Sequence, residues 1–249
     1  MSAPDALLAA ALVRDPAGPL LTYYDDATGE RTELSATSLA NWVAKTANLL
    51  RDDVGTAPGD RVAVLLPAHW QAAAILLGAW TAAAVVGTTP DGAAAAFTTA
   101  DRVPDATAAG EVFALSLAPL GRGFAGGPPP GTRDYSVDVL TMGDRWSGRP
   151  VPDAVPALET GGSTVTAGDL VEIALRRAAE LGVIAGDRVL STEPWTSPTS
   201  WLDGLLVPLA AAATLVLVAN PDESGLTAKV EAERVTATLG TPVPGVRPL

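Results

Sequence analysis

The sequence predicts an α/β fold of two pseudo-symmetric subdomains, each a mainly parallel sheet flanked by helices. Segments with strand character alternate with helical segments, an order that places helices on both faces of a parallel sheet. The same order of elements occurs twice, with an offset of 131 residues. A length of 249 residues with 48% hydrophobic content provides enough apolar side chains for one large core or two smaller ones.

The offset between the two copies is constant over their first helix. Pairs that lie 131 residues apart are Ser35 with Thr166, Leu39 with Leu170, Trp42 with Ile173, Ala47 with Ala178 and Leu50 with Leu181. Gly-Asp-Arg-Val occurs at 59–62 and again at 186–189, an offset of 127, because the second connection is four residues shorter. Pro90 and Pro221 restore the offset of 131. Loops of varying length between elements of fixed order are typical of a duplicated unit.

The first half begins with a predicted short helix at 5–13 and a hairpin at 20–34, in which we interpret Asp25 and Asp26 as solvated turn residues. The segment 39–50 carries apolar residues at i, i+3, i+4, i+7, i+8 and i+11, so it predicts a helix with one stripe against the sheet. The strand predicted at 62–66 is rich in β-branched residues and follows a Gly-Asp turn.

The second half repeats these elements. Thr166 and Asp169 form a capping-box pattern before a helix at 170–181. Strands are predicted at 189–192 and 215–218, with an apolar helix between them.

Two segments between the halves, 121–131 and 147–156, are dense in glycine and proline, which predicts loops or a linker. We therefore expect a first subdomain at 1–150 and a second at 151–249.

The composition excludes several classes of function. A net charge of −12 without a basic stripe opposes binding to nucleic acid and to anionic membranes. Cysteine is absent, so disulfides, thiol catalysis and thiolate metal sites are excluded, and no other metal site is expected. Residues 1–11 lack the basic start of a signal peptide, and the apolar runs at 72–87 and 204–219 are too short to span a bilayer. We expect a cytoplasmic protein.

Two motifs suggest chemistry but lack the required context. Residues 121–126 match Gly-x-Gly-x-x-Gly, yet Gly-Pro-Pro-Pro follows where a dinucleotide site needs a helix, so a loop is predicted. His69 is the only histidine and follows the first strand, where ligands bind in many α/β folds. A general base needs a nucleophile and an orienting carboxylate, which the sequence does not place, so we interpret His69 as a solvent-facing residue at a helix start.

The candidate phosphate loop consists of Thr160, Gly161, Gly162, Ser163 and Thr164. Small residues before a helix can bind phosphate through backbone N–H groups. The alternative is a turn between two short strands. The sequence favours the turn, because phosphate loops combine amide donors with a cation and no lysine is nearby.

The tryptophans could line a ligand cleft or fill the core. Those at helical positions are interpreted as core or subdomain-interface anchors, since a buried indole provides a large apolar area. Trp195 and Trp201 are the tryptophans to which we assign a functional role, because they flank the loop after the strand of the second half, and Trp195 with Ser197 is the candidate for a ligand cleft.

Several of these segments resemble the N-terminal half of the adenylate-forming superfamily. That superfamily contains acyl- and aryl-CoA synthetases, adenylation domains of nonribosomal peptide synthetases, and luciferases. The segment 35–90, with Pro-Gly-Asp-Arg-Val-Ala-Val-Leu-Leu-Pro at 58–67, is similar to its opening helix and first strand. Residues 186–192 and 233–242 resemble later segments. The resemblance covers most of this chain and about half of a family member, and it implies a large domain with two pseudo-symmetric α/β subdomains.

The departures from the family concern its chemistry. Its phosphate loop ends in Pro-Lys-Gly, whereas residues 160–166 keep the small residues without that ending. Its aromatic-His site corresponds to Trp195-Thr196-Ser197, which has no histidine. The sequence reaches Leu249 before the family's adenine-binding segment, ribose-binding aspartate and C-terminal domain with the catalytic lysine. Adenylation needs cations and a carboxylate-held Mg²⁺ at the phosphates. A chain without these groups lacks the electrostatic stabilisation of the reacting phosphate.

Three hypotheses follow. The first is a catalytically silent relative of the acyl-CoA synthetases with a cleft for a small molecule or a protein partner, without a cofactor unless ATP or AMP binds. The second is half of a split AMP-binding ligase that a separate chain completes. The third, a hydrolase that uses His69, has the least support. Self-association into a homo-oligomer would cover exposed sheet edges.

Overall fold

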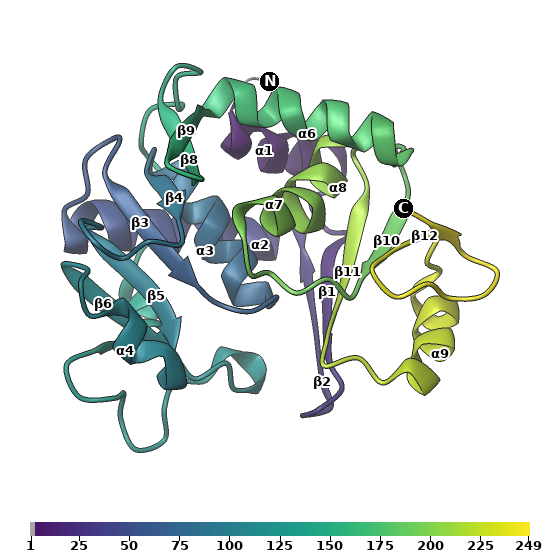
Figure 1. Ribbon diagram of the computed structural model, residues 1–249, viewed down its shortest axis with the longest axis horizontal. Helices are drawn as coiled ribbons and strands as arrows, with labels where there is room; N and C mark the ends of the chain where they lie inside the picture. Colours follow the sequence, from purple (N-terminus) through teal and green to yellow (C-terminus); the bar gives the residue numbers. More distant parts are fainter. Residues whose placement is uncertain (1–2) are drawn as a thin grey trace.

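Helices lie between two mainly parallel sheets and against the outer face of each (Figure 1). The computed structural model describes residues 3–249. Met1 and Ser2, which begin the segment where no signal peptide is expected, lie outside the described residues. The architecture confirms the predicted α/β class and its two similar units.

The two sheets contain most of the strands that the sequence predicts. The six-stranded sheet has the order β13 (Arg247–Pro248), β12 (Ala237–Leu239), β10 (Arg188–Ser191), β11 (Thr214–Ala219), β1 (Pro19–Asp25) and β2 (Glu30–Ser35). The seven-stranded sheet has the order β7 (Arg133–Asp134), β6 (Glu111–Leu115), β5 (Ala95–Thr99), β3 (Arg61–Leu65), β4 (Val85–Gly87), β8 (Pro156–Thr160) and β9 (Ser163–Thr166).

The helices follow the predicted order as well. They are α1 (Pro4–Arg14), α2 (Ala36–Asn48), α3 (Trp70–Thr81), α4 (Val103–Ala106), α5 (Tyr135–Asp138), α6 (Ala167–Leu181), α7 (Pro198–Trp201), α8 (Val207–Ala210) and α9 (Glu223–Glu233). Two helices continue as π-helical turns, α2 through Leu49–Val54 and α7 through Leu202–Leu206. None of the helices within residues 3–249 has the length and apolar character that crossing a membrane requires.

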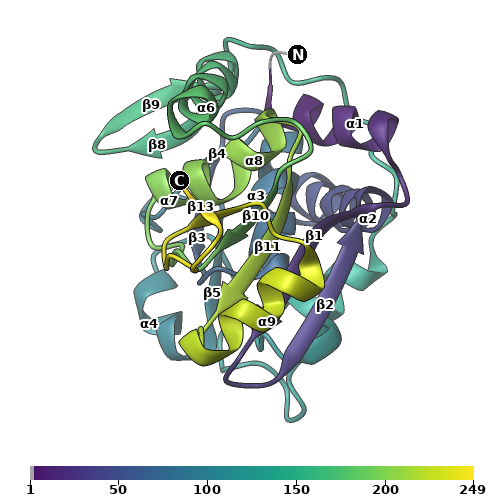
Figure 2. The same cartoon turned by 90° about the vertical axis from the view of Figure 1, so that its right-hand side faces the viewer.

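Successive side chains along a strand point to opposite faces of the sheet, so each strand contributes both to the central core and to the packing on the outer face. In β3, Val62 and Val64 face the central helices, whereas Ala63 and Leu65 pack with Ala106 of α4 on the outer face. In β11 the residues at odd positions face the centre, whereas Val216 and Val218 pack with Leu226 of α9. Figure 2 shows α9 lying across the outer face of the six-stranded sheet. Both faces of these strands are buried, as expected for parallel sheets.

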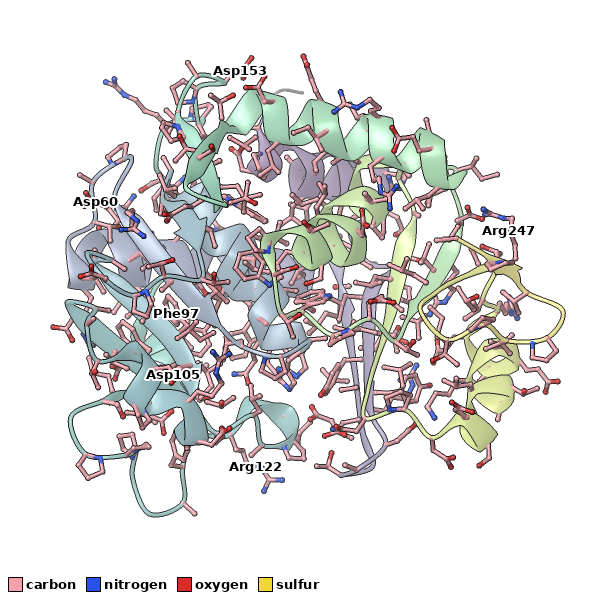
Figure 3. All side chains as sticks on the ribbon, in the orientation of Figure 1. Asp60, Phe97, Asp105, Arg122, Asp153 and Arg247 are labelled. Carbon is pink, nitrogen blue, oxygen red and sulfur yellow. The ribbon has the colours of Figure 1, made fainter. Side chains whose placement is uncertain are left out.

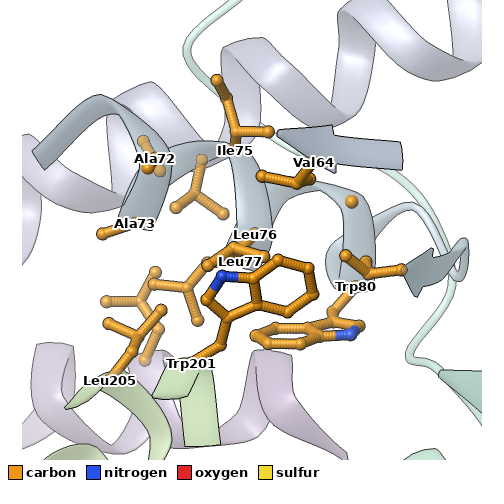
Figure 4. Close-up of a cluster of buried hydrophobic side chains, with 14 of the residues drawn as sticks. Val64, Ala72, Ala73, Ile75, Leu76, Leu77, Trp80, Trp201 and Leu205 are labelled. Carbon is orange, nitrogen blue, oxygen red and sulfur yellow. The ribbon is translucent and has the colours of Figure 1, made fainter. Parts of the chain in front are cut away.

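The centre of the molecule is α3, whose residues are all buried. Trp201 of α7 lies beside Trp80 and Leu77, and Ile75 lies on the other side of α3 beside Val64 (Figure 4). The indole Nε1 of Trp80 donates a hydrogen bond of 2.8 Å to the backbone oxygen of Ala157, which fixes the chain that enters β8. Trp80 is therefore a core anchor, as predicted for a helical tryptophan, and Trp201, to which the sequence assigned a functional role, is buried in the same core.

The caps and turns of the two units match. Ser35 and Thr166 are the N-caps of α2 and α6, where each side chain accepts a backbone hydrogen bond from the third residue beyond it. The Gly-Asp turns match too, with φ of +91° at Gly59 and +85° at Gly186. Both glycines donate to the backbone oxygen of an alanine, at 2.8 Å and 3.2 Å. Such agreement at non-regular positions supports a duplication.

The hairpins that begin the two units are exchanged. β1 and β2 belong to the first half of the chain, yet β1 pairs in parallel with β11 of the second half. In turn β8, which pairs antiparallel with β9, lies parallel to β4 of the first half. The boundary predicted near residue 150 separates the remaining strands but not these hairpins, and it stays a prediction.

Candidate functional site

A cleft of about 450 Å³ lies where the two sheets meet. Its lining comes from the carboxyl ends of β1, β3, β6, β10 and β11, and consists of Tyr23, Asp25, Pro67, Ala68, Leu117, Thr192, Glu193, Pro194, Val218, Ala219, Asn220 and Pro221. Ligands of open α/β sheets bind beyond the carboxyl ends of the strands. The volume falls within the range of small-molecule sites, about 300–1,000 Å³.

Prolines end the strands at this edge. Pro67, Pro194 and Pro221 follow β3, β10 and β11, and a proline cannot continue a central strand because it lacks the N–H donor. The backbone therefore turns away at the same level in both halves, which leaves the cleft between the turns.

Asp25 forms one wall of the cleft and is held rigidly. Its Oδ1 accepts hydrogen bonds from Asn220 Nδ2 at 2.8 Å and from the backbone N–H of Ala27 at 2.9 Å, and its Oδ2 accepts one from Thr28. Burial alone would raise the pKa of Asp25, but these hydrogen bonds outweigh burial and lower it. Asp25 is therefore an ionised carboxylate at neutral pH.

The opposite wall is the segment after β10. The hydroxyl of Thr192 accepts a hydrogen bond of 2.8 Å from the backbone N–H of Thr241. Gly240, at φ +95°, allows this approach, because an added Cβ would lie 2.5 Å from Thr192 Oγ1 and 3.1 Å from Glu193 Oε1. Glu193, one carboxylate oxygen of which lies beside Gly240, is also a lining residue of the cleft.

Cations do not line this cleft in the described part of the chain. Of the two lysines, Lys45 donates to the backbone oxygen of Met142 at 2.6 Å, and Lys229 pairs with Asp26 at 2.8 Å. With Asp25 and Glu193 both in the lining, the cleft suits a neutral or cationic group and opposes a triphosphate.

The structure places the candidate phosphate loop at a sheet edge. Thr160 pairs with Ser163 across the tight turn of Gly161 and Gly162, whose φ angles are +56° and +83°, and Thr164 continues β9. A two-residue hairpin with two positive φ angles is the turn interpretation that the sequence favours. None of these residues lines the cleft, and phosphate binding here stays a prediction.

Trp195 and Ser197 lie beside the cleft. Trp195 is 2% exposed and packs in the central core, and Ser197 is the N-cap of α7, where it forms a capping box with Ser200. The cleft is lined instead by the three residues that precede Trp195. A ligand role for Trp195 and Ser197 stays a prediction.

The interpretation of His69 as a solvent-facing residue is wrong. His69 is the N-cap of α3, as expected at a helix start, but it is 1% exposed and does not face solvent. Its Nδ1 accepts from the backbone N–H of Gln71 at 3.1 Å, so the neutral ring carries its proton on Nε2, which lies 4.0 Å from Glu30 Oε2. Burial lowers the pKa of His69 to about 3. Nε2 has no hydrogen-bond partner within residues 3–249, and a hydrolase would need a nucleophile there.

The glycine motif at 121–126 lies in a loop, as predicted. It follows β6, and the next helix, α5, begins at Tyr135 and is four residues long. The carboxylate of Asp134 accepts a hydrogen bond of 2.8 Å from the backbone N–H of Phe124, which ties the loop to β7.

Sequence reasoning missed the polar residues of the cleft. Asp25 was expected to be a solvated turn residue, and Glu193 and Asn220 drew no prediction. The available signal was their position, since each lies at or just after the carboxyl end of a strand, and a proline directly follows Glu193 and Asn220.

Solved structures of acyl-CoA ligases share this fold. The chain matches the anthranilate-CoA ligase AuaEII in complex with anthranoyl-AMP at a TM-score of 0.75 and 14% identity, over 96% of this chain and 49% of that one. Acetoacetyl-CoA synthetase from Streptomyces lividans matches at a TM-score of 0.75 and 19% identity, over 95% and 42%. The N-terminal domain of FACL13 from Mycobacterium tuberculosis matches at 0.71 and 17%, over 96% and 63%. The chain thus spans about half the length of these ligases.

Sequence comparison identifies a much nearer relative. No protein-family model matches the chain. A TIGR03089 family protein from Mycobacterium tuberculosis (strain ATCC 25618 / H37Rv) is 49% identical over 245 residues, which are 94% of this chain and 96% of that protein. The fold is that of the N-terminal portion of adenylate-forming acyl-CoA ligases. By its sequence, this chain belongs to the TIGR03089 family.

Proposed function

We propose that this chain is a catalytically silent relative of the acyl-CoA ligases and that its cleft binds a small neutral or cationic molecule. The observation that carries the proposal is the charge of the cleft, where Asp25 and Glu193 line the walls without a lysine or arginine. Ligases of ATP stabilise the transferred phosphoryl group with cations and Mg²⁺.

The repulsion between a triphosphate and the carboxylates of the cleft has a magnitude of several kcal/mol, roughly, as Coulomb's law shows. Two like charges about 4 Å apart repel by roughly 4 kcal/mol at the effective dielectric of a protein surface. A triphosphate in this cleft would meet such repulsion without a compensating side-chain cation. The pKa of Asp25 is lowered, so protonation does not relieve the repulsion at neutral pH.

The test is direct measurement of nucleotide binding and turnover. Titration of the purified protein with ATP, with and without Mg²⁺, is expected to give no saturable heat. Pyrophosphate release is expected to stay at background with acetate, benzoate and decanoate as acids. A Glu193→Lys variant, which places a cation in the cleft, should bind ATP more tightly than the parent protein. Robust acyl-adenylate formation by the unmodified chain alone would refute the proposal.

Half of a split ligase is the second candidate. The observation that favours it is coverage, because the chain aligns with only 42% of acetoacetyl-CoA synthetase and 49% of the anthranilate ligase. A separate chain would then supply the cations and the Mg²⁺ ligand. Pyrophosphate release that appears only when a second chain is added to the purified protein would support this candidate over the silent relative.

A further inference from the structure

A second cavity, which we name the linker cavity, lies away from the cleft and has a volume of about 370 Å³. The segment 146–155 covers it, and it is lined by Arg51, Thr56, Pro58, Thr81, Ala82, Ala83, Trp146, Gly148, Arg149, Pro150, Val151, Pro152 and Val155. Figure 3 shows Asp153, in that segment, at the opposite end of the molecule from Arg122, which follows β6 on the cleft side. The cavity therefore opens at the amino ends of the strands.

The walls of the linker cavity are mainly apolar. Ala82 is the C-cap of α3 and Ala83 follows it, and the lining also contains three prolines and two valines. A Cβ at Gly148 would collide with the ring of Trp146, so the segment can fold back on this tryptophan only because residue 148 is glycine. An apolar body of a ligand would fit these walls without leaving a polar group unpaired.

The charged groups in the lining are all positive, which is unusual in a chain of net charge −12. Arg51, in the π-helical turn, stacks over Trp146 at 4.4 Å and also donates to Asp52 at 2.6 Å. Arg149 is exposed and has no ion-pair partner within the described chain. Asp5 and Asp144 line a neighbouring hollow that shares Thr81 and Trp146 with the linker cavity and do not line the linker cavity itself, so an anionic group is favoured at Arg149.

The hydroxyl of Thr56, a residue that lines the linker cavity, is unsatisfied by the residues that the structure describes. Thr56 is 7% exposed and lines the linker cavity, and its Oγ1 has no hydrogen-bond partner among residues 3–249. Buried hydroxyls without a partner are rare in folded proteins, because burial removes their hydrogen bonds to water and no protein group replaces them. This oxygen is itself buried, so a ligand in the linker cavity would reach it only if the wall of the cavity shifted.

We propose that the linker cavity binds an amphipathic monoanion, with its apolar body between α3 and the segment 146–155 and its carboxylate at Arg149. The guanidinium of Arg149 offers two parallel N–H donors that match a carboxylate. This site is separate from the cleft, so it does not depend on the proposed function. The bound ligand would hold the segment 146–155 against α3.

The experiment uses decanoate as the probe and decanol as its uncharged partner, both measured by isothermal titration on the full chain. Decanoate is expected to bind roughly tenfold more tightly than decanol, since a charge-assisted hydrogen bond has about that effect on affinity. Arg149→Gln should abolish this difference. Arg145→Gln, which changes an exposed arginine just before that segment that does not line the linker cavity, should leave it unchanged.

Two further variants locate the site. Ala82→Leu fills the linker cavity and should remove binding of both probes. Glu193→Gln alters only the cleft and should have no effect. Thermal unfolding of each variant confirms that it is folded. Equal affinity for both probes, no binding of either, or decanoate binding that responds to Glu193→Gln and not to Arg149→Gln would overturn the proposal.

Discussion

Replacing Glu233 by glutamine should destabilise the protein by about 2–4 kcal/mol, because it removes a buried charge with two arginine partners. Glu233 is 6% exposed. It accepts hydrogen bonds from Tyr24 Oη at 2.6 Å, Arg31 at 2.9 Å and Arg188 at 2.6 Å. The cluster joins α9 to β1, β2 and β10, so it ties the exchanged hairpin to the second half.

The magnitude depends on how buried each partner is. Arg188 is 20% exposed and would keep an uncompensated charge, whereas Arg31 is 46% exposed and retains Glu33 at 2.7 Å. Most of the loss therefore comes from Arg188. Glu33→Gln is the matched control, because it removes only an exposed partner of Arg31 and should cost less than about 1 kcal/mol.

The pH dependence gives a second readout. Burial alone would raise the pKa of Glu233, but hydrogen bonds from Tyr24, Arg31 and Arg188 hold it below the ordinary value of 4.5. Its stabilising effect is therefore complete above that value and is lost as pH falls through the folded-state pKa. Urea unfolding at neutral and at acid pH should show the gap between Glu233→Gln and the parent closing in acid. A gap no larger than that of Glu33→Gln, or one unaffected by acid, would refute this reasoning.

Three other predictions concern the core, a cap and the histidine. Trp201→Ala should lower the free energy of unfolding by about 3–5 kcal/mol because Trp201 is 1% exposed, whereas Leu175→Ala, at 49% exposure, should cost far less; equal losses in urea unfolding would contradict the packing. Thr166→Ala should cost about 1 kcal/mol by removing the N-cap of α6, and Thr166→Ser should restore it in thermal unfolding; a failure of serine to do so would argue against the cap. The imidazole of His69, the only histidine, should show no NMR titration until about pH 3, so stability falls as pH drops from 6.5 toward 3 while the unfolded chain takes up the proton; a midpoint near 6.5 would show that the ring is accessible.

The sequence predicted the elements better than their partners. The N-caps Ser35 and Thr166 and the Gly-Asp turns depend on neighbouring residues, so local patterns were sufficient to find them. The exchange of hairpins was missed, because alternation in residues 19–35 says that one face is buried but not which strand lies alongside. That strand, β11, comes about 190 residues later in the chain.

In the candidate site, too, local features were predicted from the sequence and long-range contacts were not. The carboxyl-end edge was predictable, since strands and the prolines after them are local features. The burial of His69 depends on Tyr23 and Glu30 of the exchanged hairpin, which the sequence does not place against α3. Asp25 belongs to the cleft for the same reason, because it ends β1 and β1 lies beside β11.

The exchange of the two hairpins makes each half of the chain the missing edge of the other. If the backbone were cleaved within residues 146–155, β4 would lose its neighbour β8, and β11 would lose β1. Each fragment would then expose unpaired backbone N–H and C=O groups whose best available partner is the other fragment. The nicked protein should therefore stay together without a covalent link, and the two halves should melt as one unit rather than as a pair of domains.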